Sequence, residues 1–488
     1  MKLSKVLCDI DCKLNNFIDL EISHISMNTN DITKNTLFFC IKGQNQDSHD
    51  LAELAIQKGA IALVVERLLD VPVPQIVVNN TREVVGKCAE NFYHNPRKNF
   101  QLIGVTGTNG KTTTTYMIKN ILEMAGYKVG VIGTIGVVIN QQKSPANLTT
   151  PDPIELHKIF YDMVQQEIDF VVMEVSAHSI DLQKISGLVF DVGILTNVTQ
   201  DHLDYFGTFQ NYLEVKKEFL TPKYCKVGVV NVDDVAGLSI VMNNPEIPML
   251  TYGLKNPADC FATKINYTLN GTTYFLNIQD NLNAINTRLI GEFNVYNAMG
   301  AGVACTALGI NQSAIKAGLS TCDFVEGRFN VVMLANGAYA VIDYAHTPDG
   351  IENILSSVRK VTKGKIYSLF GCGGNRDTSK RSIMGKISAK LADFTIITSD
   401  NPRYEEPNEI IKDIEKGVKS LTSNYICIEN RKMAINYALR QLNKGDVVVI
   451  AGKGAENYLD IKGQKIPYSD AETISSEYEK IQLEAVKW

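Results

Sequence analysis

The residues of this sequence that are best suited to chemistry lie in the segment Gly107-Thr108-Asn109-Gly110-Lys111-Thr112. The segment follows the apolar run Leu102 to Val105 and precedes a helical pattern that extends to about Met124. Glycines let backbone N–H groups approach phosphate oxygens, a helix N-terminus adds positive potential, and the lysine reaches the terminal phosphates. Although Val105 replaces the first glycine of the usual motif, the pattern favours a nucleotide-binding loop over an ordinary strand-to-helix turn.

Two polar clusters follow the next apolar runs. Glu174 comes directly after the run Phe170 to Met173, and His202 follows the run Val192 to Leu195. Because the carboxyl ends of parallel strands share one crevice, both side chains are expected beside the phosphate loop. Together with the Thr112 hydroxyl they are candidate Mg²⁺ ligands. The alternatives are a hydrogen-bonded loop histidine for His202 and a helix-capping role for Glu174.

Short apolar runs that alternate with helical patterns must position these residues. From Leu102 the runs are continuously apolar, which indicates a parallel sheet covered by helices on both faces. A similar alternation begins near residue 327 and predicts a second doubly wound domain. Between the two, the tight-turn pair Asn270-Gly271 predicts a hairpin insertion. The expected strands are 37–39, 60–65, 75–78, 102–105, 129–132, 170–173, 192–195, 227–230, 261–267, 272–278, 331–334, 339–342, 366–370, 394–398, 425–428 and 447–450.

The predicted fold class is therefore α/β with three domains. Residues 1–98 form a small N-terminal α/β domain, 99–326 a central P-loop ATPase domain with a parallel sheet, and 327–488 a C-terminal doubly wound, Rossmann-like domain. The length of 488 residues agrees with this number, since domains usually span about 100–200 residues.

Composition excludes several classes of protein. The net charge of −5 argues against a basic nucleic-acid-binding chain, and 45% hydrophobic residues against a disordered one. Ten scattered cysteines show no Cys-x-x-Cys pair, so neither a disulfide framework nor a zinc site is expected. Without a signal peptide or a long apolar segment, the chain is expected to be cytoplasmic, with no membrane insertion and as a monomer.

Ten ordered motifs give this chain a resemblance to the Mur ligase family, the ATP-dependent amide-bond formers of peptidoglycan precursor synthesis. They are GTNGKT (107–112), TTPD (149–152), MEVSAHS (173–179), TN with DHLDYFG (196–197 and 201–207), GEFNVYN (291–297), GR (327–328), DYAHTPD (343–349), GCGGNRD (371–377), DNPR (400–403) and AGKGAEN (451–457). Within the family the chain is most similar to members that add the third peptide residue to UDP-MurNAc-L-Ala-D-Glu.

The resemblance implies that the N-terminal domain binds the uridine nucleotide and that the C-terminal domain closes over a central ATP site. ATP would phosphorylate the D-glutamate γ-carboxylate, and the amine of the incoming amino acid would displace phosphate. The residues implied to bind ATP are Gly107, Thr108, Asn109, Gly110, Lys111, Thr112, Thr113, Asn294, Asn297, Arg328, Asp343 and His346.

The resemblance also implies that Lys216 is carbamylated, which turns an ammonium into a negatively charged Mg²⁺ ligand. The implied metal ligands are then Thr112, Glu174, His202 and Lys216, and the implied catalytic residues are Lys111, Glu174, His202 and Lys216. A solvated surface lysine is the alternative for Lys216.

Two further sets of residues follow from the resemblance. The set for UDP-MurNAc-dipeptide is Thr29, Thr149, Thr150, Ser176 and Lys184, and the set for meso-diaminopimelate is Arg376, Asp400, Asn401, Pro402, Arg403, Gly452 and Glu456. Three positions depart from the family pattern: Asn28-Thr29-Asn30 replaces Asp-Ser-Arg, Leu182 replaces a polar residue, and Ala455 replaces a histidine.

Three alternatives remain open. The same ligase could use L-lysine, the chain could be a related amide ligase such as a folylpolyglutamate synthetase, or it could be a catalytically silent nucleotide-binding scaffold. Arg403 favours diaminopimelate, because a guanidinium pairs with the extra carboxylate that lysine lacks. The presence of Lys111, Glu174, His202 and Lys216 argues against a silent scaffold.

Overall fold

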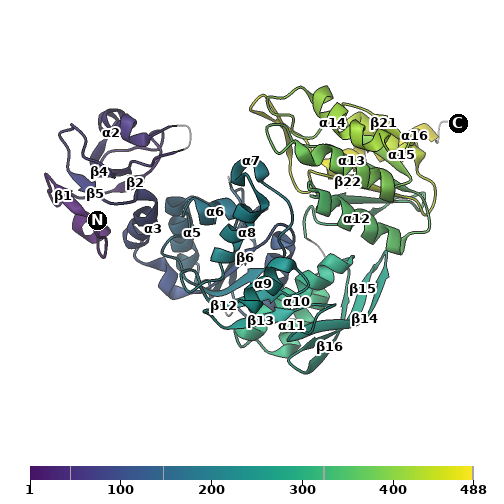
Figure 1. Ribbon diagram of the computed structural model, residues 1–488, viewed down its shortest axis with the longest axis horizontal. Coiled ribbons are helices and arrows are strands. Elements are labelled where there is room, and N and C mark those ends of the chain that lie inside the picture. Colours follow the sequence, from purple (N-terminus) through teal and green to yellow (C-terminus); the bar gives the residue numbers. More distant parts are fainter. Residues whose placement is uncertain (44–45, 147, 244, 323–324, 486–488) are drawn as a thin grey trace.

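The computed structural model describes residues 1–43, 46–146, 148–243, 245–322 and 325–485. Three lobes follow one another along the chain, and each is built around its own β-sheet (Figure 1). The N-terminal and C-terminal lobes flank the central lobe, and α7 (Leu203–Phe206) lies between them in this view (Figure 1). Sheets with helices throughout confirm the predicted α/β class, whereas the domain boundaries at 98/99 and 326/327 stay predictions.

The N-terminal sheet has the strand order β1-β5-β4-β3-β2, with β1 antiparallel to β5 and the other neighbours parallel. Helix α3 packs on α5 of the central lobe, which fixes the N-terminal lobe to the sheet that carries the phosphate loop. The elements of this lobe are α1 (Leu3–Val6), β1 (Lys13–Asn15), β2 (His24–Ser26), β3 (Thr36–Phe39), η1 (Ser48–Leu51), α2 (Ala52–Lys58), β4 (Ala60–Val65), β5 (Gln75–Val77), α3 (Thr81–Phe92) and η2 (Pro96–Asn99).

The central sheet has eleven strands, and its middle six, β13-β12-β11-β6-β10-β7, are parallel. Neighbouring residues of β6 enter opposite cores: Leu102 packs with α5 and α8, and Ile103 packs with α4, α10 and α11. Helices therefore cover both faces, as the continuous apolar runs predict. The parallel strands are β6 (Gln101–Thr106), β7 (Val129–Gly133), β10 (Phe170–Glu174), β11 (Phe190–Leu195), β12 (Cys225–Asn231) and β13 (Met249–Tyr252), and the helices are α4 (Lys111–Met124), α5 (Pro153–Gln165), α6 (Ala177–Asp181), α7, α8 (Phe209–Glu218), α9 (Val235–Met242), α10 (Glu292–Ala307) and α11 (Gln312–Thr321).

The sheet continues beyond these parallel strands at both edges, and the predicted hairpin insertion is part of it. The predicted hairpin becomes β14 (Cys260–Thr268) and β15 (Gly271–Ile278), and β14 continues the sheet from β13 through the pair Tyr252↔Cys260. A third strand, β16 (Asn281–Thr287), pairs with β15. At the opposite edge lie β8 (Gly136–Ile139) and β9 (Gln142–Ser144).

The C-terminal sheet has the order β17-β18-β22-β19-β20-β21 and is parallel except for β17. Helices α12, α13 and α14 cover one face, and α15 and α16 cover the other, which gives the predicted doubly wound arrangement. The elements are β17 (Asn330–Met333), β18 (Tyr339–Asp343), α12 (Pro348–Val361), β19 (Ile366–Phe370), α13 (Ser379–Leu391), β20 (Phe394–Ile397), α14 (Pro407–Lys419), β21 (Tyr425–Cys427), α15 (Arg431–Gln441), β22 (Val447–Ala451), the hairpin β23 (Tyr458–Ile461) and β24 (Gln464–Pro467), and α16 (Asp470–Ala485).

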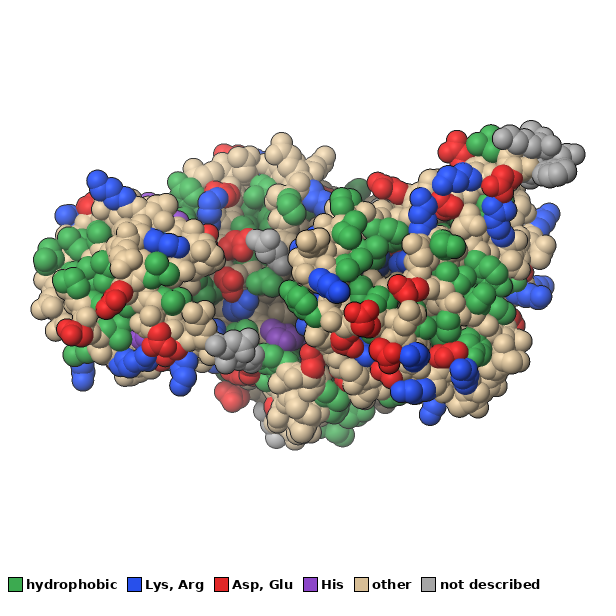
Figure 2. Space-filling view, turned by 90° about the horizontal axis from the view of Figure 1, so that it is seen from above, with side chains coloured by type: hydrophobic (Ala, Val, Ile, Leu, Met, Phe, Trp, Pro, Cys, Tyr) green, Lys and Arg blue, Asp and Glu red, His purple; other side chains and the backbone are tan. Residues whose placement is uncertain are grey.

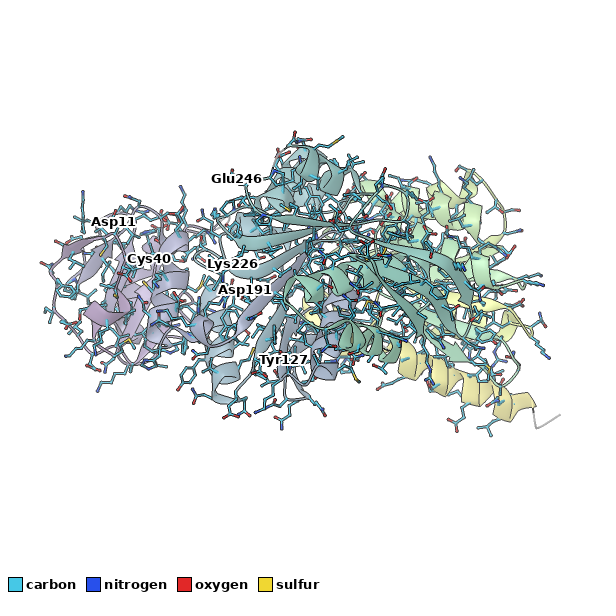
Figure 3. All side chains as sticks on the ribbon, turned by 90° about the horizontal axis from the view of Figure 1, so that it is seen from below. Asp11, Cys40, Tyr127, Asp191, Lys226 and Glu246 are labelled. Carbon is cyan, nitrogen blue, oxygen red and sulfur yellow. The ribbon has the colours of Figure 1, made fainter. Side chains whose placement is uncertain are left out.

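Asp191 fastens the strand that leads to the phosphate loop. Its carboxylate accepts hydrogen bonds from the Leu102 N–H and an Arg97 guanidinium nitrogen, both at 2.8 Å. The other carboxylate oxygen accepts a 2.7 Å bond from Lys226 on the neighbouring strand, and Asp191 and Lys226 are labelled in Figure 3. One side chain thus fixes the entry of β6 against β11 and β12.

In the described part of the chain, no helix combines the length and apolar character needed to cross a membrane.

Candidate active site

The strand register brings the predicted site residues together at one edge of the central sheet. Glu174 at the end of β10 is opposite Val105 of β6, and Leu195 at the end of β11 is opposite Thr106. The loops after all three strands therefore meet, as expected for the carboxyl ends of parallel strands. This arrangement places Glu174 and the loop after Leu195 beside residues 107–112.

The phosphate loop needs its two glycines for shape and for space. Gly107 and Gly110 have positive φ values of 145° and 85°, which other residues rarely adopt. A Cβ on Gly107 would collide with the Thr196 hydroxyl, and one on Gly110 with the Asn297 side-chain oxygen. Helix α4 begins at Lys111, so its free N–H groups face the loop, where an anion is favoured.

Lys111 bends back over the loop that it follows. Its Nζ donates to the backbone oxygens of Gly107 and Thr108, both at 2.9 Å. Burial lowers the pKa of Lys111 from its ordinary value, and Glu174 opposes that shift. A phosphate placed in the loop would therefore meet a pre-positioned amine.

Glu174 and Thr112 form the candidate metal-binding pair. The Thr112 hydroxyl donates to Glu174 Oε1 at 2.9 Å. Thr134 donates to the same carboxylate twice, from its N–H at 2.9 Å and from its hydroxyl at 3.0 Å. Since the Glu174 side chain is 1% exposed, these hydrogen bonds hold a buried anion where a cation would be attracted.

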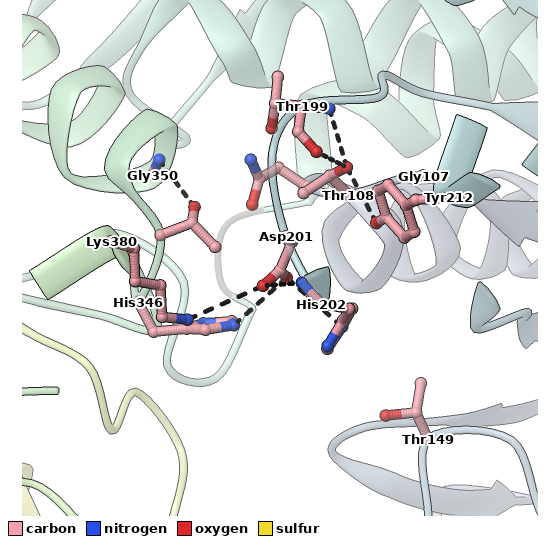
Figure 4. A network of polar contacts seen from close by, with 12 residues as sticks. Gly107, Thr108, Thr149, Thr199, Asp201, His202, Tyr212, His346, Gly350 and Lys380 are labelled. Carbon is pink, nitrogen blue, oxygen red and sulfur yellow. Dashed lines mark hydrogen bonds and ion pairs between the residues drawn. The ribbon is translucent and has the colours of Figure 1, made fainter. Parts of the chain in front are cut away.

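Lys216 lies beneath the loop and not on the surface. Its side chain is 1% exposed, and Nζ donates to Gly107 O at 2.9 Å. The Tyr212 ring centroid is 4.9 Å from this nitrogen, while the Tyr212 hydroxyl contacts Thr108 (Figure 4). Burial, followed by the charge of Lys111, lowers the pKa of Lys216 well below its ordinary value. The structure therefore contradicts the alternative of a solvated surface lysine.

Asp201 lies close to the side chains of His202, His346 and Lys380, which come from two lobes (Figure 4). Its carboxylate lies 3.4 Å from His202 Nε2, 3.9 Å from His346 Nε2 and 3.8 Å from Lys380 Nζ. Burial opposes its charge, but His202, His346 and Lys380 prevail and lower the pKa of Asp201 to about 2. Burial also lowers the pKa of His202 to about 3, so its neutral imidazole is available as a ligand.

The oxygen donors of this site suit Mg²⁺ better than a metal ion that is usually bound by several histidine or cysteine side chains. Among the residues that the structure describes, no group of three or more His, Cys, Asp or Glu side chains is arranged to hold a metal ion. A hydroxyl and a carboxylate beside a phosphate loop instead match the way in which Mg²⁺ is held by one or two protein oxygens and by nucleotide phosphates. Thr112 and Glu174 therefore fit that ion.

These residues line a cavity of about 620 Å³, within the size range of ligand sites. The surface is hollowed between the lobes, and charged and histidine side chains are visible there (Figure 2). The C-terminal lobe contributes to the wall. Arg328 donates to the Thr112 hydroxyl at 2.9 Å, and burial raises the pKa of Asp343, whose carboxylate accepts from Phe329 N at 2.7 Å. The predicted residues on this wall are Thr108, Asn109, Gly110, Lys111, Thr112, Thr113, Thr149, Glu174, Ser176, His202, Asn297, Arg328, Asp343 and His346.

Two predicted residues, Asn294 and Thr150, hydrogen-bond to residues that line this cavity. Asn294 donates to Ile290 O at 2.8 Å and accepts from Asn297, so it orients the residue that faces the cavity. The Thr150 hydroxyl donates to Glu174 O at 2.9 Å and accepts from Ser176 N at 3.0 Å. Thr150 therefore ties the predicted acceptor segment to the strand that ends at Glu174.

Two residues predicted for the UDP-MurNAc-dipeptide lie elsewhere. Lys184 pairs with Asp152 at 2.8 Å, and Thr29 lies in the N-terminal lobe, where its backbone oxygen accepts from Lys58. Neither residue lines the cavities at residues 107–112 or 400–403. The structure thus does not bring Thr29 or Lys184 to the phosphate loop.

A second cavity, of about 280 Å³, collects the residues predicted for the amino acid. The Arg403 guanidinium donates to Gly374 O at 2.9 Å, and its Nε lies 3.7 Å from Asp460. Arg403 also has a positive φ of 51°, and the β23 hairpin holds it because its N–H donates to Asp460 O at 3.0 Å. The predicted residues on this wall are Arg376, Asp400, Asn401, Arg403, Gly452 and Glu456, with Pro402 within the same turn.

The structure adds site residues that the sequence reasoning missed. Asp201, Tyr344, Asp349 and Lys380 all line one or both cavities. The first three lie inside the motifs DHLDYFG and DYAHTPD, so their positions in those motifs were a usable signal. No such signal marks Lys380, because its local pattern is that of an ordinary helix lysine and its role depends on how the lobes are placed.

Known protein families and relatives are similar to this chain over most of its length. Residues 105–305 match the family model of the Mur ligase middle domain, and residues 327–454 match that of the Mur ligase glutamate ligase domain. The UDP-N-acetylmuramoyl-L-alanyl-D-glutamate--2,6-diaminopimelate ligase 1 of Clostridium acetobutylicum is 44% identical over 98% of this chain and 99% of its own. The ligase of the same name from Geobacillus thermodenitrificans is 41% identical over 92% and 93%.

Solved structures show the same fold. A UDP-N-acetylmuramoyl-L-alanyl-D-glutamate--2,6-diaminopimelate ligase is similar with a TM-score of 0.68 and 30% identity, over 96% of this chain and 97% of that chain. A Mycobacterium tuberculosis folylpolyglutamate synthase has a TM-score of 0.63 at 16% identity, over 75% and 91%. The second likeness concerns the fold alone.

Proposed function

The chain belongs to the Mur ligase family, and from this premise we propose that it joins meso-diaminopimelate to UDP-MurNAc-L-Ala-D-Glu at the expense of ATP. Members of this family are ATP-dependent amide ligases. The proposal includes a cytoplasmic location, a monomeric chain, and the division into a UDP-binding domain (1–98), an ATP-binding domain (99–326) and a closing domain (327–488). The alternative of a silent scaffold is disfavoured, because the lysines and the acidic residue that chemistry needs are in place at the loop.

The observation that carries the proposal is the wall between the two cavities. Five residues, Thr149, Asp201, His202, Tyr344 and His346, line both the cavity of the phosphate loop and the cavity of Arg403. A ligase must bring a phosphorylated carboxylate and an amine into contact while keeping their binding sites separate. Two adjoining cavities with a common wall satisfy that requirement.

The reaction has two balanced steps. A γ-carboxylate oxygen of the D-glutamate attacks the terminal phosphorus of ATP, and ADP leaves, which gives an acyl phosphate. The amine of the diamino acid then attacks the acyl carbon and loses a proton, and phosphate leaves with the bonding electrons. Lys111 and the N–H groups at the start of α4 stabilise the charge on the transferring phosphoryl group.

Thr112 and Glu174 would hold one Mg²⁺ ion and His202 a second, and these ions would neutralise the negative charges by which the acceptor carboxylate and the phosphate repel each other. Lys216 supplies a further oxygen ligand when it carries a carbamate, which forms as its neutral amine attacks CO₂ and releases a proton. Burial beside Lys111 supports that modification, because it favours the neutral amine. The amide bond itself forms when the amine attacks the acyl phosphate.

Selection of meso-diaminopimelate over L-lysine rests on Arg403. Its guanidinium is a paired donor for the distal carboxylate, which lysine does not have. Without that carboxylate the guanidinium would face the cavity with part of its donors unused.

A phosphate-release assay tests the proposal against its rivals. We expect phosphate release that requires ATP, the UDP-MurNAc-dipeptide and meso-diaminopimelate together. Release with a folate and glutamate would instead support a folylpolyglutamate synthetase, and no release with any substrate pair would support a silent nucleotide-binding protein.

A further inference from the structure

Lys453 is a buried cation that the proposed reaction does not use. It lies in the loop after β22 and its side chain is 0% exposed. Its Nζ donates to Asn401 Oδ1 at 2.9 Å and lies 3.3 Å from both Glu456 Oε2 and Asp400 Oδ1. All three partners belong to the wall of the smaller cavity.

These contacts form a closed triangle. Lys453 donates to Asn401 Oδ1 and to Glu456 Oε2, and Asn401 Nδ2 donates to the same Glu456 Oε2 at 2.8 Å. Because an ammonium has only donors, it must face the amide oxygen of Asn401 and leaves the amide nitrogen directed at Glu456. Lys453 and the Asp460 N–H, which donates to the same oxygen at 2.9 Å, together fix the orientation of the amide.

The triangle also decides which oxygen of Glu456 remains for a ligand. Oε2 already accepts from two donors, whereas Oε1 has a single contact among the described residues, a 3.4 Å hydrogen bond from the Tyr344 hydroxyl. Tyr344 lines both cavities. Oε1 is therefore the oxygen that can receive an additional ammonium.

Lys453 links residues from two loops whose preceding strands are not neighbours in the sheet. Asp400 and Asn401 follow β20 and Glu456 follows β22, but β19 lies between these strands in the sheet. A buried ammonium costs several kcal/mol of desolvation unless carboxylates and hydrogen bonds surround it, as Asp400, Asn401 and Glu456 do. Lys453 therefore adds a buried link beside the backbone hydrogen bonds by which Asp460 and Lys462 already join Arg403 to the β23 hairpin.

We propose that Lys453 is a positioning residue that holds Glu456 so that its Oε1 receives the distal ammonium of the diamino acid. This inference rests on the proposed function and adds to it a residue that acts through Glu456. Because Lys453 offsets the charge of one of its two carboxylate neighbours, the pair retains one negative charge for the incoming ammonium.

The test compares two amino acids that differ only in the distal amine. Meso-diaminopimelate has it, whereas 2-aminopimelate keeps the chain length and the distal carboxylate but lacks that amine. We expect Lys453→Met to raise the KM for meso-diaminopimelate at least tenfold, with the KM values for 2-aminopimelate and ATP within twofold of wild type. The control is Lys462→Met, since Lys462 is exposed and its side chain only approaches Glu406 at 4.0 Å.

Conservative variants separate positioning from folding. Lys453→Arg keeps the charge and should restore part of the selectivity for the diamino acid. If Lys453→Met lacks the wild-type unfolding transition, Lys453→Gln, which also removes the charge, takes its place in the comparison. Equal changes for both amino acids, or none, would overturn the inference and leave the ligase assignment intact. A wild-type enzyme that uses neither amino acid would overturn the proposed function, and this inference with it.

Discussion

Asn109 of the phosphate loop donates a 2.6 Å hydrogen bond to Asp349, which lies in the first turn of α12 in the C-terminal lobe. The two residues are 240 positions apart in the sequence, and both line the larger cavity. Burial raises the pKa of Asp349, and the bond from Asn109 opposes that shift. The contact thus joins the C-terminal lobe directly to the loop that is proposed to hold the nucleotide.

Loss of this contact should weaken nucleotide binding. We expect Asp349→Ala to raise the dissociation constant for a non-hydrolysable ATP analogue about tenfold, since a hydrogen bond to a charged acceptor contributes about 1.5 kcal/mol or more. Asp349→Asn keeps an oxygen acceptor and should lose less. Calorimetry that finds equal affinity for wild type and Asp349→Ala would show that the contact does not support binding.

Lys111→Ala should abolish ligation without unfolding the protein. Among the described residues, the Lys111 Nζ donates hydrogen bonds to the loop oxygens of Gly107 and Thr108. Loss of such a charge at a phosphoryl-transfer site costs at least about 3 kcal/mol, roughly a hundredfold in turnover. Lys119→Ala is the matched control, because Lys119 lies on the same helix and pairs with Glu123. Near-normal turnover by folded Lys111→Ala would remove the loop from the mechanism.

Lys216→Ala should also be inactive, and acetate or formate should restore part of its activity. The expected reason is that a small carboxylate can enter the space of the lost carbamate and supply a Mg²⁺ ligand. Lys217→Ala, on the neighbouring residue that pairs with Glu214, should stay active. Wild-type activity of Lys216→Ala in the absence of added acid would rule out the carbamate.

Arg403→Ala should lose most activity with meso-diaminopimelate, by about a hundredfold in kcat/KM, because a paired contact to the distal carboxylate is lost. Arg403→Lys keeps the charge but not the two-pronged donor and should recover only part. Arg440→Ala is a control, since Arg440 pairs with Glu484 on the far helices α15 and α16. Unchanged steady-state kinetics of Arg403→Ala would contradict this role.

The buried His157 side chain makes the free energy of unfolding depend on pH. Its side chain is 2% exposed, and its Nδ1 has no hydrogen-bond partner among the described residues. Burial, with a smaller effect of Lys87, lowers the pKa of His157 from 6.5 to about 3. Between these values the unfolded chain binds a proton that the folded chain does not, so the free energy of unfolding falls as the pH falls.

Replacing His157 should therefore flatten the acid side of the stability profile. We expect wild type to lose about 2 kcal/mol more than His157→Leu between pH 7.5 and pH 5, as 1.4 kcal/mol per pH unit below the unfolded pKa implies. Urea unfolding across this pH range measures the difference. Parallel profiles for the two proteins would show that His157 is protonated equally in both states.

Much of the fold follows from local sequence patterns. The parallel strands β6, β7, β10, β11 and β12 are long apolar runs between helical patterns, and they were predicted to within two residues at each end. Strand β16 was missed because its buried face carries Asn283 and Thr287, while Leu282 on the same strand is 62% exposed. An inward polar face reverses the pattern on which such predictions rely.

The candidate site was predictable where motifs follow neighbouring strands of one parallel sheet. The phosphate loop, Glu174 and His202 follow strands whose ends meet, so their proximity could be inferred from the sequence. The contacts of Asp349 with Asn109 and of Lys380 with Asp201 depend on how the lobes are placed, which no local pattern encodes.

The central claim is the identity of the amino acid that the enzyme adds. The most direct test is the mass of the product that wild-type enzyme forms from ATP, Mg²⁺ and UDP-MurNAc-L-Ala-D-Glu with equal concentrations of meso-diaminopimelate and L-lysine. We predict the diaminopimelate product, with the lysine product about a thousandfold less abundant because Arg403 would lack its carboxylate partner. Comparable amounts of the two products, or the lysine product alone, would contradict it.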